Sequence, residues 1–261
     1  MGKITEALKK VADERLQRIE KINKIKEQDR LVIQKMESSE IDSRLISYFD
    51  PKAIITEQYK VLRTNILSMN KGNPPKVIVV SSSLHSEGKT ITALNVSIVM
   101  AQETRRPKIL LVDGDLRRGK ISKYLGVKNK IGLSEILQGQ ATLNDAIFSI
   151  GVDNLSFITT GSTPANPVEL LSSAHMHSFL ADIKEKFDYV LIDSPPVIPV
   201  TDPGILGSQA DGVLLVIKAG RTQRGIVQHA SELLSQARAK ILGHVLTNIE
   251  YHLPEYIYRY L

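Results

Sequence analysis

The segment Val77-Ile-Val-Val-Ser-Ser-Ser-Leu-His-Ser-Glu-Gly-Lys-Thr90 decides the fold of this 261-residue chain. It opens as a short apolar run typical of a buried strand, passes through a polar loop, and ends where a helical pattern over 88–104 begins. A strand, such a loop and a helix in this order form the context of a phosphate-binding P-loop. Because the first glycine of the strict motif is Ser83 here, this context carries more weight than the motif itself.

Apolar runs and helical patterns alternate along the chain on both sides of this segment. The runs predict strands over 76–81, 108–113, 154–159, 189–193, 212–217 and 241–247. Helical periodicity predicts helices over 88–104, 168–185 and 222–239. Continuous apolar strands alternating with helices are typical of a parallel sheet covered on both faces. The expected fold is therefore α/β, a P-loop NTPase-like parallel sheet flanked by helices.

Acidic side chains stand where two of these strands end. Asp113 and Asp115 follow one strand, and Asp193 closes another in the manner of a Walker B element. Because the carboxyl ends of parallel strands meet at one edge of a sheet, the carboxylates and the P-loop should lie together. A P-loop lysine reaches nucleotide phosphates, and a hydroxyl and carboxylates bind Mg²⁺ there. The sequence thus predicts a site for ATP and Mg²⁺.

The candidate residues of this site fall into three overlapping groups. Nucleotide binding is expected from Ser86, Glu87, Gly88, Lys89, Thr90 and Ile91. Catalysis is expected from Lys89, Asp113, Asp115 and Asp193, and metal binding from Thr90, Asp113, Asp115 and Asp193. As a loop residue, Lys89 is expected to be exposed, so that Lys89→Met would leave the fold intact.

Composition narrows the class of protein. Apolar residues make up 42% and charged residues 24%, as in globular proteins. Cysteine is absent, which fits a reducing compartment, and the apolar runs are too short for a membrane helix. We therefore expect a cytoplasmic protein. The net charge of +6 is concentrated in 1–36, where acids and bases alternate along one amphipathic pattern, so no nucleic acid partner is expected.

The pattern divides the chain into three parts. Residues 1–45 are expected to form a basic amphipathic helix, 46–250 the P-loop domain, and 251–261 a tail rich in tyrosine. Four of the eight tyrosines lie in that tail: Tyr251, Tyr256, Tyr258 and Tyr260. Pro254 and the terminal position favour a mobile segment that can enter a neighbouring active site.

These motifs resemble the cytoplasmic bacterial tyrosine kinases (BY-kinases) of exopolysaccharide and capsule export, which share the P-loop fold of MinD/ParA ATPases. The resemblance rests on the P-loop, on Asp113-x-Asp115-x-Arg117, and on Ile192-Asp-Ser-Pro-Pro196. It rests also on Gly161-x-x-Pro-x-Asn-Pro-x-Glu-Leu-Leu171, on Glu57-Gln-Tyr-Lys-Val-Leu-Arg-Thr-Asn65 and on the tyrosine tail.

The resemblance implies an ATP-dependent tyrosine autokinase that regulates polysaccharide polymerisation and export. Its implied phosphorylation sites are Tyr251, Tyr256, Tyr258 and Tyr260, modified in trans. Glu57, Lys60 and Arg63 would lie on an oligomerisation helix of a homo-oligomer such as a ring. A separate transmembrane co-polymerase adaptor would recruit the kinase to the inner face of the plasma membrane, and a tyrosine phosphatase would oppose it.

Two other functions share these motifs. A ParA/MinD-like switch would hydrolyse ATP with water as the nucleophile and has no use for a tyrosine tail. A scaffold would bind nucleotide only to set its oligomeric state. Three positions depart from the BY-kinase pattern: Ser86 and Thr247 stand where the family more often has glycine and asparagine, and Lys60 replaces an arginine. Ser86 would crowd the loop if a positive φ were needed there.

Overall fold

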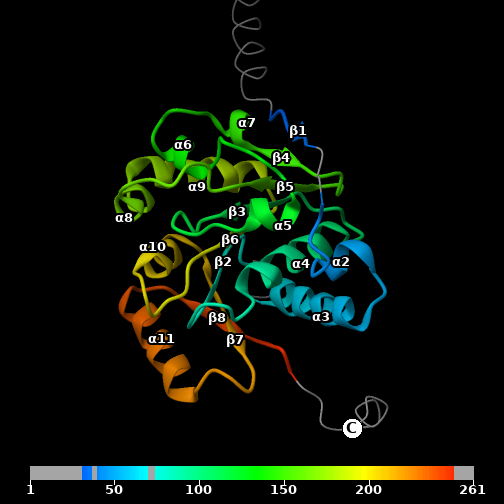
Figure 1. Ribbon diagram of the computed structural model, residues 1–261, viewed down its shortest axis with the longest axis vertical. Coiled ribbons are helices and arrows are strands. Elements are labelled where there is room, and N and C mark those ends of the chain that lie inside the picture. Colours follow the sequence, from blue (N-terminus) through cyan, green and yellow to red (C-terminus); the bar gives the residue numbers. More distant parts are fainter. Residues whose placement is uncertain (1–30, 37–39, 70–73, 250–261) are drawn as a thin grey trace, which may run out of the picture. The chain divides into compact units, whose positions relative to one another are not determined.

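The computed structural model describes residues 31–36, 40–69 and 74–249, and one compact unit begins at Ile33. At its centre lies an eight-stranded sheet in the order β1-β4-β5-β3-β6-β2-β7-β8 (Figure 1). The strands are β1 Gln34–Lys35, β2 Val77–Ser82, β3 Ile109–Asp113, β4 Phe148–Ser149, β5 Leu155–Ile158, β6 Tyr189–Asp193, β7 Gly212–Lys218 and β8 Ile241–Thr247. All six predicted strands are confirmed, and they pair in parallel.

Two short strands at one edge were not expected. β4 pairs antiparallel to β5 where Phe148 lies opposite Phe157, and β1 adds in parallel to β4. The two phenylalanine rings stack with centroids 5.8 Å apart, which explains why so short a strand holds its place. The sheet is therefore mostly, not wholly, parallel.

Helices cover both faces of the sheet. They are α2 Ile46–Phe49, α3 Ile54–Ser68, α4 Lys89–Ala101, α5 Ile121–Leu125, α6 Leu133–Leu137, α7 Leu143–Ala146, α8 Pro167–Leu171, α9 Ala174–Lys186, α10 Asp202–Gln209 and α11 Arg224–Gln236. Helix α4 packs on β2, β3 and β6, with α2 and α3 against it, while α10 and α11 pack on β2, β7 and β8 (Figure 1). The predicted α/β fold is confirmed.

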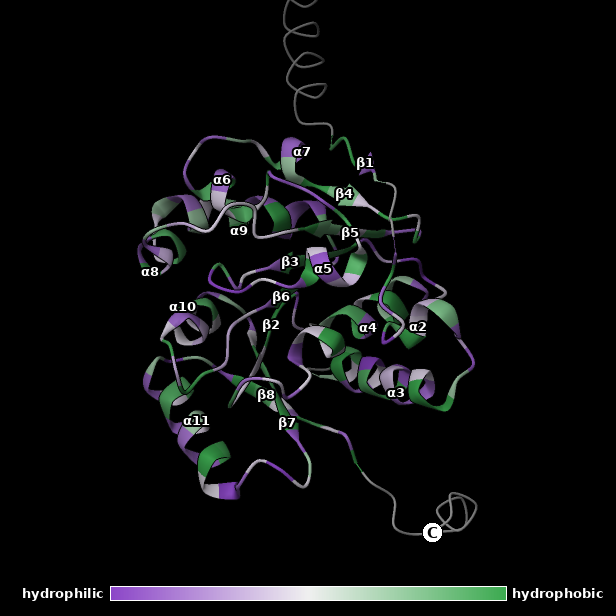
Figure 2. Ribbon diagram, viewed as in Figure 1, coloured by the Kyte–Doolittle hydropathy of each residue, from purple (hydrophilic) through white to green (hydrophobic). Residues whose placement is uncertain are grey.

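Helix α4 is buried almost throughout, because it is covered by the sheet on one side and by α2 and α3 on the other. Figure 2 shows hydrophobic residues on this helix and on the central strands. Its buried polar side chains serve the site or the packing. Asn95, wholly buried, donates to the carbonyls of Arg44 and Ile91 and accepts from the N–H of Ser47 at 2.9 Å.

The helix predicted over 168–185 is interrupted. Helix α8 ends at Leu171 and α9 starts at Ala174, because the side chain of Ser173 accepts a hydrogen bond from the N–H of Met176 and caps the second helix. Helix α10 was not predicted, since its sequence begins Asp-Pro-Gly and lacks a strong apolar period. Helical periodicity alone did not reveal either feature.

The predicted division after residue 45 also differs from the structure. Residues 34–35 form strand β1 rather than helix, and 40–49 pack onto the P-loop domain. Leu45 is wholly buried in the core, which is why this segment belongs to the compact unit. The rest of the predicted N-terminal helix, 1–30, and the tail, 251–261, lie outside the described residues.

We expect Asn95→Ala to destabilise the domain by about 2–4 kcal/mol, because the buried N–H of Ser47 and carbonyl of Arg44 lose their partners. Chemical denaturation measures the free energy of unfolding. The matched control is Asn65→Ala on the exposed side of α3, expected to change stability by less than about 0.5 kcal/mol. Equal effects of the two variants would contradict the anchoring role of Asn95.

Candidate functional site

Parallel pairing brings the predicted carboxylates to one edge of the sheet. In the β3–β6 pair Asp113 lies directly opposite Asp193, and in the β2–β6 pair Val80 lies opposite Asp193. The P-loop follows β2, so all three chain segments converge at the carboxyl ends of central strands. The edge predicted from the sequence is confirmed by this register.

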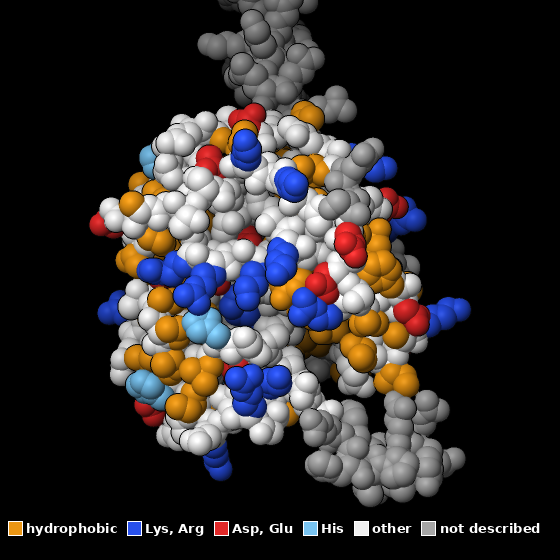
Figure 3. All heavy atoms as spheres, viewed as in Figure 1, with side chains coloured by type: hydrophobic (Ala, Val, Ile, Leu, Met, Phe, Trp, Pro, Cys, Tyr) orange, Lys and Arg blue, Asp and Glu red, His pale blue; other side chains and the backbone are white. Residues whose placement is uncertain are grey.

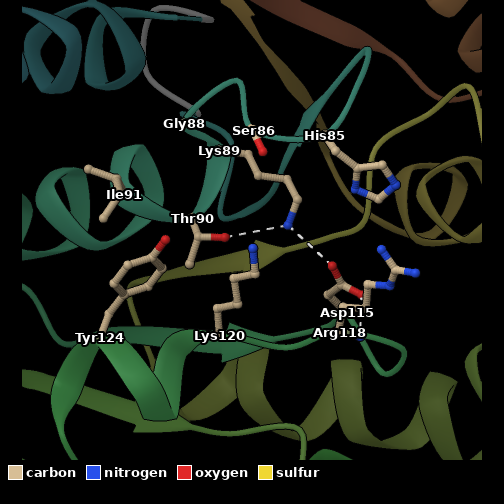
Figure 4. A pocket seen from close by; sticks show the side chains of 10 residues that line it. All are labelled: His85, Ser86, Gly88, Lys89, Thr90, Ile91, Asp115, Arg118, Lys120 and Tyr124. Atoms are coloured by element: carbon tan, nitrogen blue, oxygen red, sulfur yellow. Dashed lines mark hydrogen bonds and ion pairs between the residues drawn. The ribbon is translucent and has the colours of Figure 1, made fainter.

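The P-loop turns sharply before α4 begins at Lys89. Gly88 adopts φ 98° and Ser86 φ 63°, both in the left-handed region. This conformation is less favourable for Ser86 than for glycine, because serine carries a Cβ. The positive φ considered at Ser86 from the sequence is thus present. The loop surrounds a cavity of about 170 Å³ (Figure 4). The cavity is lined by His85, Ser86, Gly88, Lys89, Thr90, Ile91, Asp115, Arg118, Lys120 and Tyr124.

The side chain of Lys89 lies among carboxylates rather than in solvent. Its Nζ is 3.3 Å from Asp115 Oδ2 and 3.5 Å from Asp193 Oδ1, and Thr90 Oγ1 donates to Asp193 Oδ2 at 2.6 Å. Only 13% of the Lys89 side chain is exposed. The expectation of an exposed lysine was therefore wrong, because the strand ends bring two acidic side chains to the loop.

This cluster shifts the pKa values of its members. Burial alone would lower the pKa of Lys89, but the charges of Asp193, Asp115 and Asp113 outweigh it and raise that pKa. Burial raises the pKa of Asp193 in turn, against the opposing pull of Lys89. The ammonium is thus held in its charged form.

Asp113 lies behind the cavity, while Asp115 faces it. Asp113 is buried, and its Oδ2 accepts the N–H of Ile121 at 2.9 Å. Burial, followed by the charge of Asp193, raises the pKa of Asp113 to about 8. Asp115 lines the cavity and points toward Lys89 (Figure 4). The sequence left the roles of these two aspartates open, and the structure distinguishes their positions.

The oxygen donors suit Mg²⁺ bound together with phosphates. Thr90 Oγ1 and the carboxylates of Asp193 and Asp115 converge beside the loop. Among the described residues no preformed group of three metal-ligating side chains exists. Lys89 Nζ pairs with both Asp115 and Asp193. Mg²⁺ commonly binds through one or two protein oxygens plus substrate phosphates, and these residues fit that pattern.

Glu87 faces away from the cavity. Its buried carboxylate accepts hydrogen bonds from the N–H of Leu84 at 2.6 Å and from the hydroxyl of Thr222. Its carbonyl accepts the hydroxyl of Thr247 at 2.7 Å, at the end of β8. The side chain of Glu87 thus ties the P-loop to the β7–α11 loop, and Thr247 ties it to β8. Of the residues predicted to bind nucleotide, the other five line the cavity.

The predicted oligomerisation residues make contacts within their own chain. On α3, Lys60 Nζ is 2.7 Å from Glu57 Oε1, and Arg63 donates to the carbonyl of Val99 on α4 at 2.8 Å. Glu57 is exposed, whereas Arg63 is half-buried against α4. The same helix also exposes Ile54, Ile55 and Val61. The oligomerisation role remains a prediction.

Several residues of the site were missed. His85, Arg118, Lys120 and Tyr124 line the cavity, although no role was predicted for any of them from the sequence. Arg118 and Lys120 could have been found from their closeness to Asp115, whereas Tyr124 reaches the cavity only because α5 folds beside it. The predicted phosphorylation sites Tyr251, Tyr256, Tyr258 and Tyr260 lie outside the described residues.

Comparison with known proteins identifies the family. A family model described as AAA domain matches residues 75–241. Tyrosine-protein kinase YwqD of Bacillus subtilis (strain 168) is 33% identical over 216 residues, which are 83% of this chain and 90% of YwqD. This chain belongs to the bacterial tyrosine-protein kinase family. The kinase domain of Escherichia coli tyrosine kinase ETK matches with a TM-score of 0.76 at 30% identity, over 85% of this chain and 86% of that domain.

A second structure gives the same result. The chimerical protein CapA2B2 matches the present bacterial tyrosine kinase with a TM-score of 0.76 at 29% identity, over 88% of this chain and 99% of the chimera. The ATPase MinD of Pyrococcus horikoshii, complexed with Mg-ADP, matches less well, with a TM-score of 0.57 at 25% identity over 70% of this chain. The family predicted from the sequence is confirmed, and the MinD-like alternative is less supported. Within the described residues, no helix is long and apolar enough to cross a membrane.

The raised pKa of Asp113 predicts a pH dependence of stability. A carboxyl whose pKa is higher in the folded protein stabilises the fold below about pH 4, and this contribution is lost as the pH rises through about 8. Asp113→Asn removes the titration and keeps an acceptor for Ile121. The measurement is the melting temperature of the variant minus that of wild type, without nucleotide. We expect this difference to be at least about 2 °C larger at pH 8 than at pH 4.

The control for this measurement is Asp153→Asn, at an exposed position. Its melting temperature relative to wild type should not vary with pH. A constant difference between Asp113→Asn and wild type over the same range would show that Asp113 does not titrate as described.

Proposed function

We propose that this kinase transfers the γ-phosphoryl group of ATP to tyrosines of its own C-terminal segment, in trans between neighbouring copies. The observation that carries the proposal is the convergence of Lys89, Thr90 and Asp115 on one cavity beside a P-loop, with buried Asp193 bonded to Lys89 and Thr90. Its sequence context is the cluster Tyr251, Tyr256, Tyr258 and Tyr260, for which a hydrolytic switch has no use.

The residues of the cavity divide the work of phosphoryl transfer. The backbone N–H groups of the loop and of the first turn of α4 would bind the phosphates, and Lys89 would neutralise charge on the transferred group. Thr90 and Asp193 would hold Mg²⁺, which when bound neutralises phosphate charge. Asp115 faces the cavity and would orient the tyrosine hydroxyl and accept its proton, while buried Asp113 supports the loop that carries Asp115.

The cellular setting follows from the resemblance to BY-kinases. The proposed role is regulation of exopolysaccharide or capsule polymerisation and export from the cytoplasm. A separate transmembrane co-polymerase adaptor would recruit and activate the kinase at the inner face of the plasma membrane. A homo-oligomer such as a ring would present each tail to a neighbour, and a tyrosine phosphatase would remove the phosphate.

Incubation of the full chain with Mg²⁺ and labelled ATP tests the reaction. We expect phosphotyrosine in wild type and a loss of at least about 100-fold in Lys89→Met and in Asp115→Asn. Lys240→Met is the matched control and should keep wild-type activity. Lys240 directly precedes β8, so it lies at the amino ends of the strands, whereas the site lies at their carboxyl ends. Because Lys89 neutralises buried carboxylates, the melting temperature of each variant must be recorded.

The same assay separates the alternatives. Phosphate released to water without phosphotyrosine would favour the ATPase switch, and neither product would favour the scaffold. Wild-type autophosphorylation in both Lys89→Met and Asp115→Asn would overturn the assignment of the site.

If α3 forms the interface of the proposed oligomer, reversing a charge on α3 should weaken assembly. Glu57→Arg should shift the unphosphorylated protein toward monomer and slow autophosphorylation, because the new charge would stand at the proposed interface. Glu232→Arg on α11 is a matched control, since 56% of its side chain is exposed against 57% for Glu57. Light scattering measures the mass of each variant. An unchanged mass for Glu57→Arg, at a concentration where wild type is oligomeric, would contradict the interface.

A further inference from the structure

A second cavity of about 360 Å³ adjoins the nucleotide cavity. It is lined by His85, Asp115, Arg117, Arg118, Pro195, Pro196, Pro199 and Val200. Three of these residues, His85, Asp115 and Arg118, also line the nucleotide cavity. A molecule in the second cavity would therefore also contact Asp115, whereas Lys89 lines only the nucleotide cavity.

One wall of the second cavity is apolar and firmly attached to the P-loop strand. Pro195, Pro196, Pro199 and Val200 form this wall. The segment that carries them is fixed by three hydrogen bonds to the end of β2 and the start of the loop. They run from Val197 N to Ser82 O (2.8 Å), from Ile198 N to Ser83 O (3.3 Å) and from Ser81 Oγ to Pro195 O (2.7 Å). Rigid proline rings of this kind suit the face of an aromatic ring.

The rest of the lining is polar. Arg117 makes two hydrogen bonds to Asp202, from Nε at 2.9 Å and from Nη2 at 3.1 Å, and Asp202 is wholly buried at the start of α10. This bidentate ion pair holds Arg117 in place and satisfies its charge. The other carboxylate in the lining is that of Asp115, whose Oδ1 accepts the backbone N–H of Arg118 at 3.0 Å and whose Oδ2 lies 3.3 Å from Lys89 Nζ.

A guanidinium and an imidazole lie beside Asp115 in the lining of this cavity. Within the described residues, the guanidinium of Arg118 makes no hydrogen bond or ion pair, and neither does the imidazole of His85. Figure 4 shows Arg118, His85 and Asp115 on the same side of the P-loop cavity. Lys and Arg side chains gather across the middle of this face of the molecule (Figure 3). A ligand with a negative charge next to an aromatic ring matches this arrangement.

We propose that the second cavity binds the ring of the acceptor tyrosine, and that Arg118 at its rim selects a tyrosine that follows an acidic residue. This inference rests on the proposed kinase function. The phenolic oxygen forms a bond to the γ-phosphorus of ATP while the bond from that phosphorus to the β–γ bridging oxygen breaks. ADP leaves with the electron pair, and the phenolic proton passes to Asp115.

The sequence of the tail then ranks its tyrosines. Tyr251 directly follows Glu250 and Tyr256 directly follows Glu255, whereas Tyr258 and Tyr260 both adjoin Arg259. A glutamate would be attracted to Arg118, and an arginine would be repelled by it. The first two tyrosines are therefore the preferred acceptors, and the last two the poorer ones.

The test uses full-length chains that keep a single tail tyrosine, with the other three changed to Phe. Initial rates of phosphotyrosine formation are compared for the chain that keeps Tyr256 and the chain that keeps Tyr258. The ratio of the two rates cancels any change in ATP affinity, which matters because Arg118 also lines the nucleotide cavity. Each pair of chains is made in the wild-type background and with Arg118→Glu. Lys240→Glu, at the opposite edge of the sheet, is the control.

We expect Tyr256 to react faster than Tyr258 in the wild-type background, and Arg118→Glu to lower their rate ratio by about fivefold. Glu255→Arg should lower the ratio similarly, and Arg118→Glu combined with Glu255→Arg should restore it. Lys240→Glu should leave the ratio unchanged. A ratio that Arg118→Glu does not move, or a double variant without recovery, would overturn the selection by Arg118 while the kinase function stands. Absence of phosphotyrosine in every chain, wild type included, would instead overturn the proposed function itself.

Discussion

The site depends on one electrostatic constraint. The ammonium group of Lys89 must balance the charge of buried carboxylates. Asp113 and Asp193 face each other across the β3–β6 pair, and Asp115 joins them from the next turn. Buried carboxylates repel one another and lose their hydration, so the cluster needs a cation. Lys89 supplies this cation. Its ion pairs hold both its own ammonium group and the carboxylate oxygens in place before any nucleotide binds.

The surrounding backbone is shaped to let this cluster close. A Cβ at Gly114 would lie 2.7 Å from Ile192 Cγ2, and a Cβ at Gly119 would lie 2.7 Å from Asp113 Oδ2. Both contacts are too short for any side chain, so glycine at these positions allows the loop after β3 to pass over the strand ends. The loop can then present Asp115 to both cavities while Asp113 stays buried.

Much of the fold and the main part of the site could be predicted from the sequence. Six strands and the P-loop helix α4 were correct because continuous apolar runs and a strand-loop-helix motif are local signals. The break between α8 and α9 depends on one serine cap, and β4 depends on a stacked pair of phenylalanines. The burial of Lys89 and the second cavity depend on which segments meet in space, and the sequence pattern does not record that.

The hydrogen bond between Thr247 and the P-loop sets where the tyrosine-bearing segment starts. Even fully extended, the chain from Thr247 to Tyr256 can span no more than about 30 Å. A substrate on so short a tether is delivered at a local concentration fixed by chain length, not by the amount of protein in solution. In the proposed oligomer, dilution should therefore not slow the reaction once two copies are assembled, and lengthening the tether should lower the local concentration of the acceptor tyrosine.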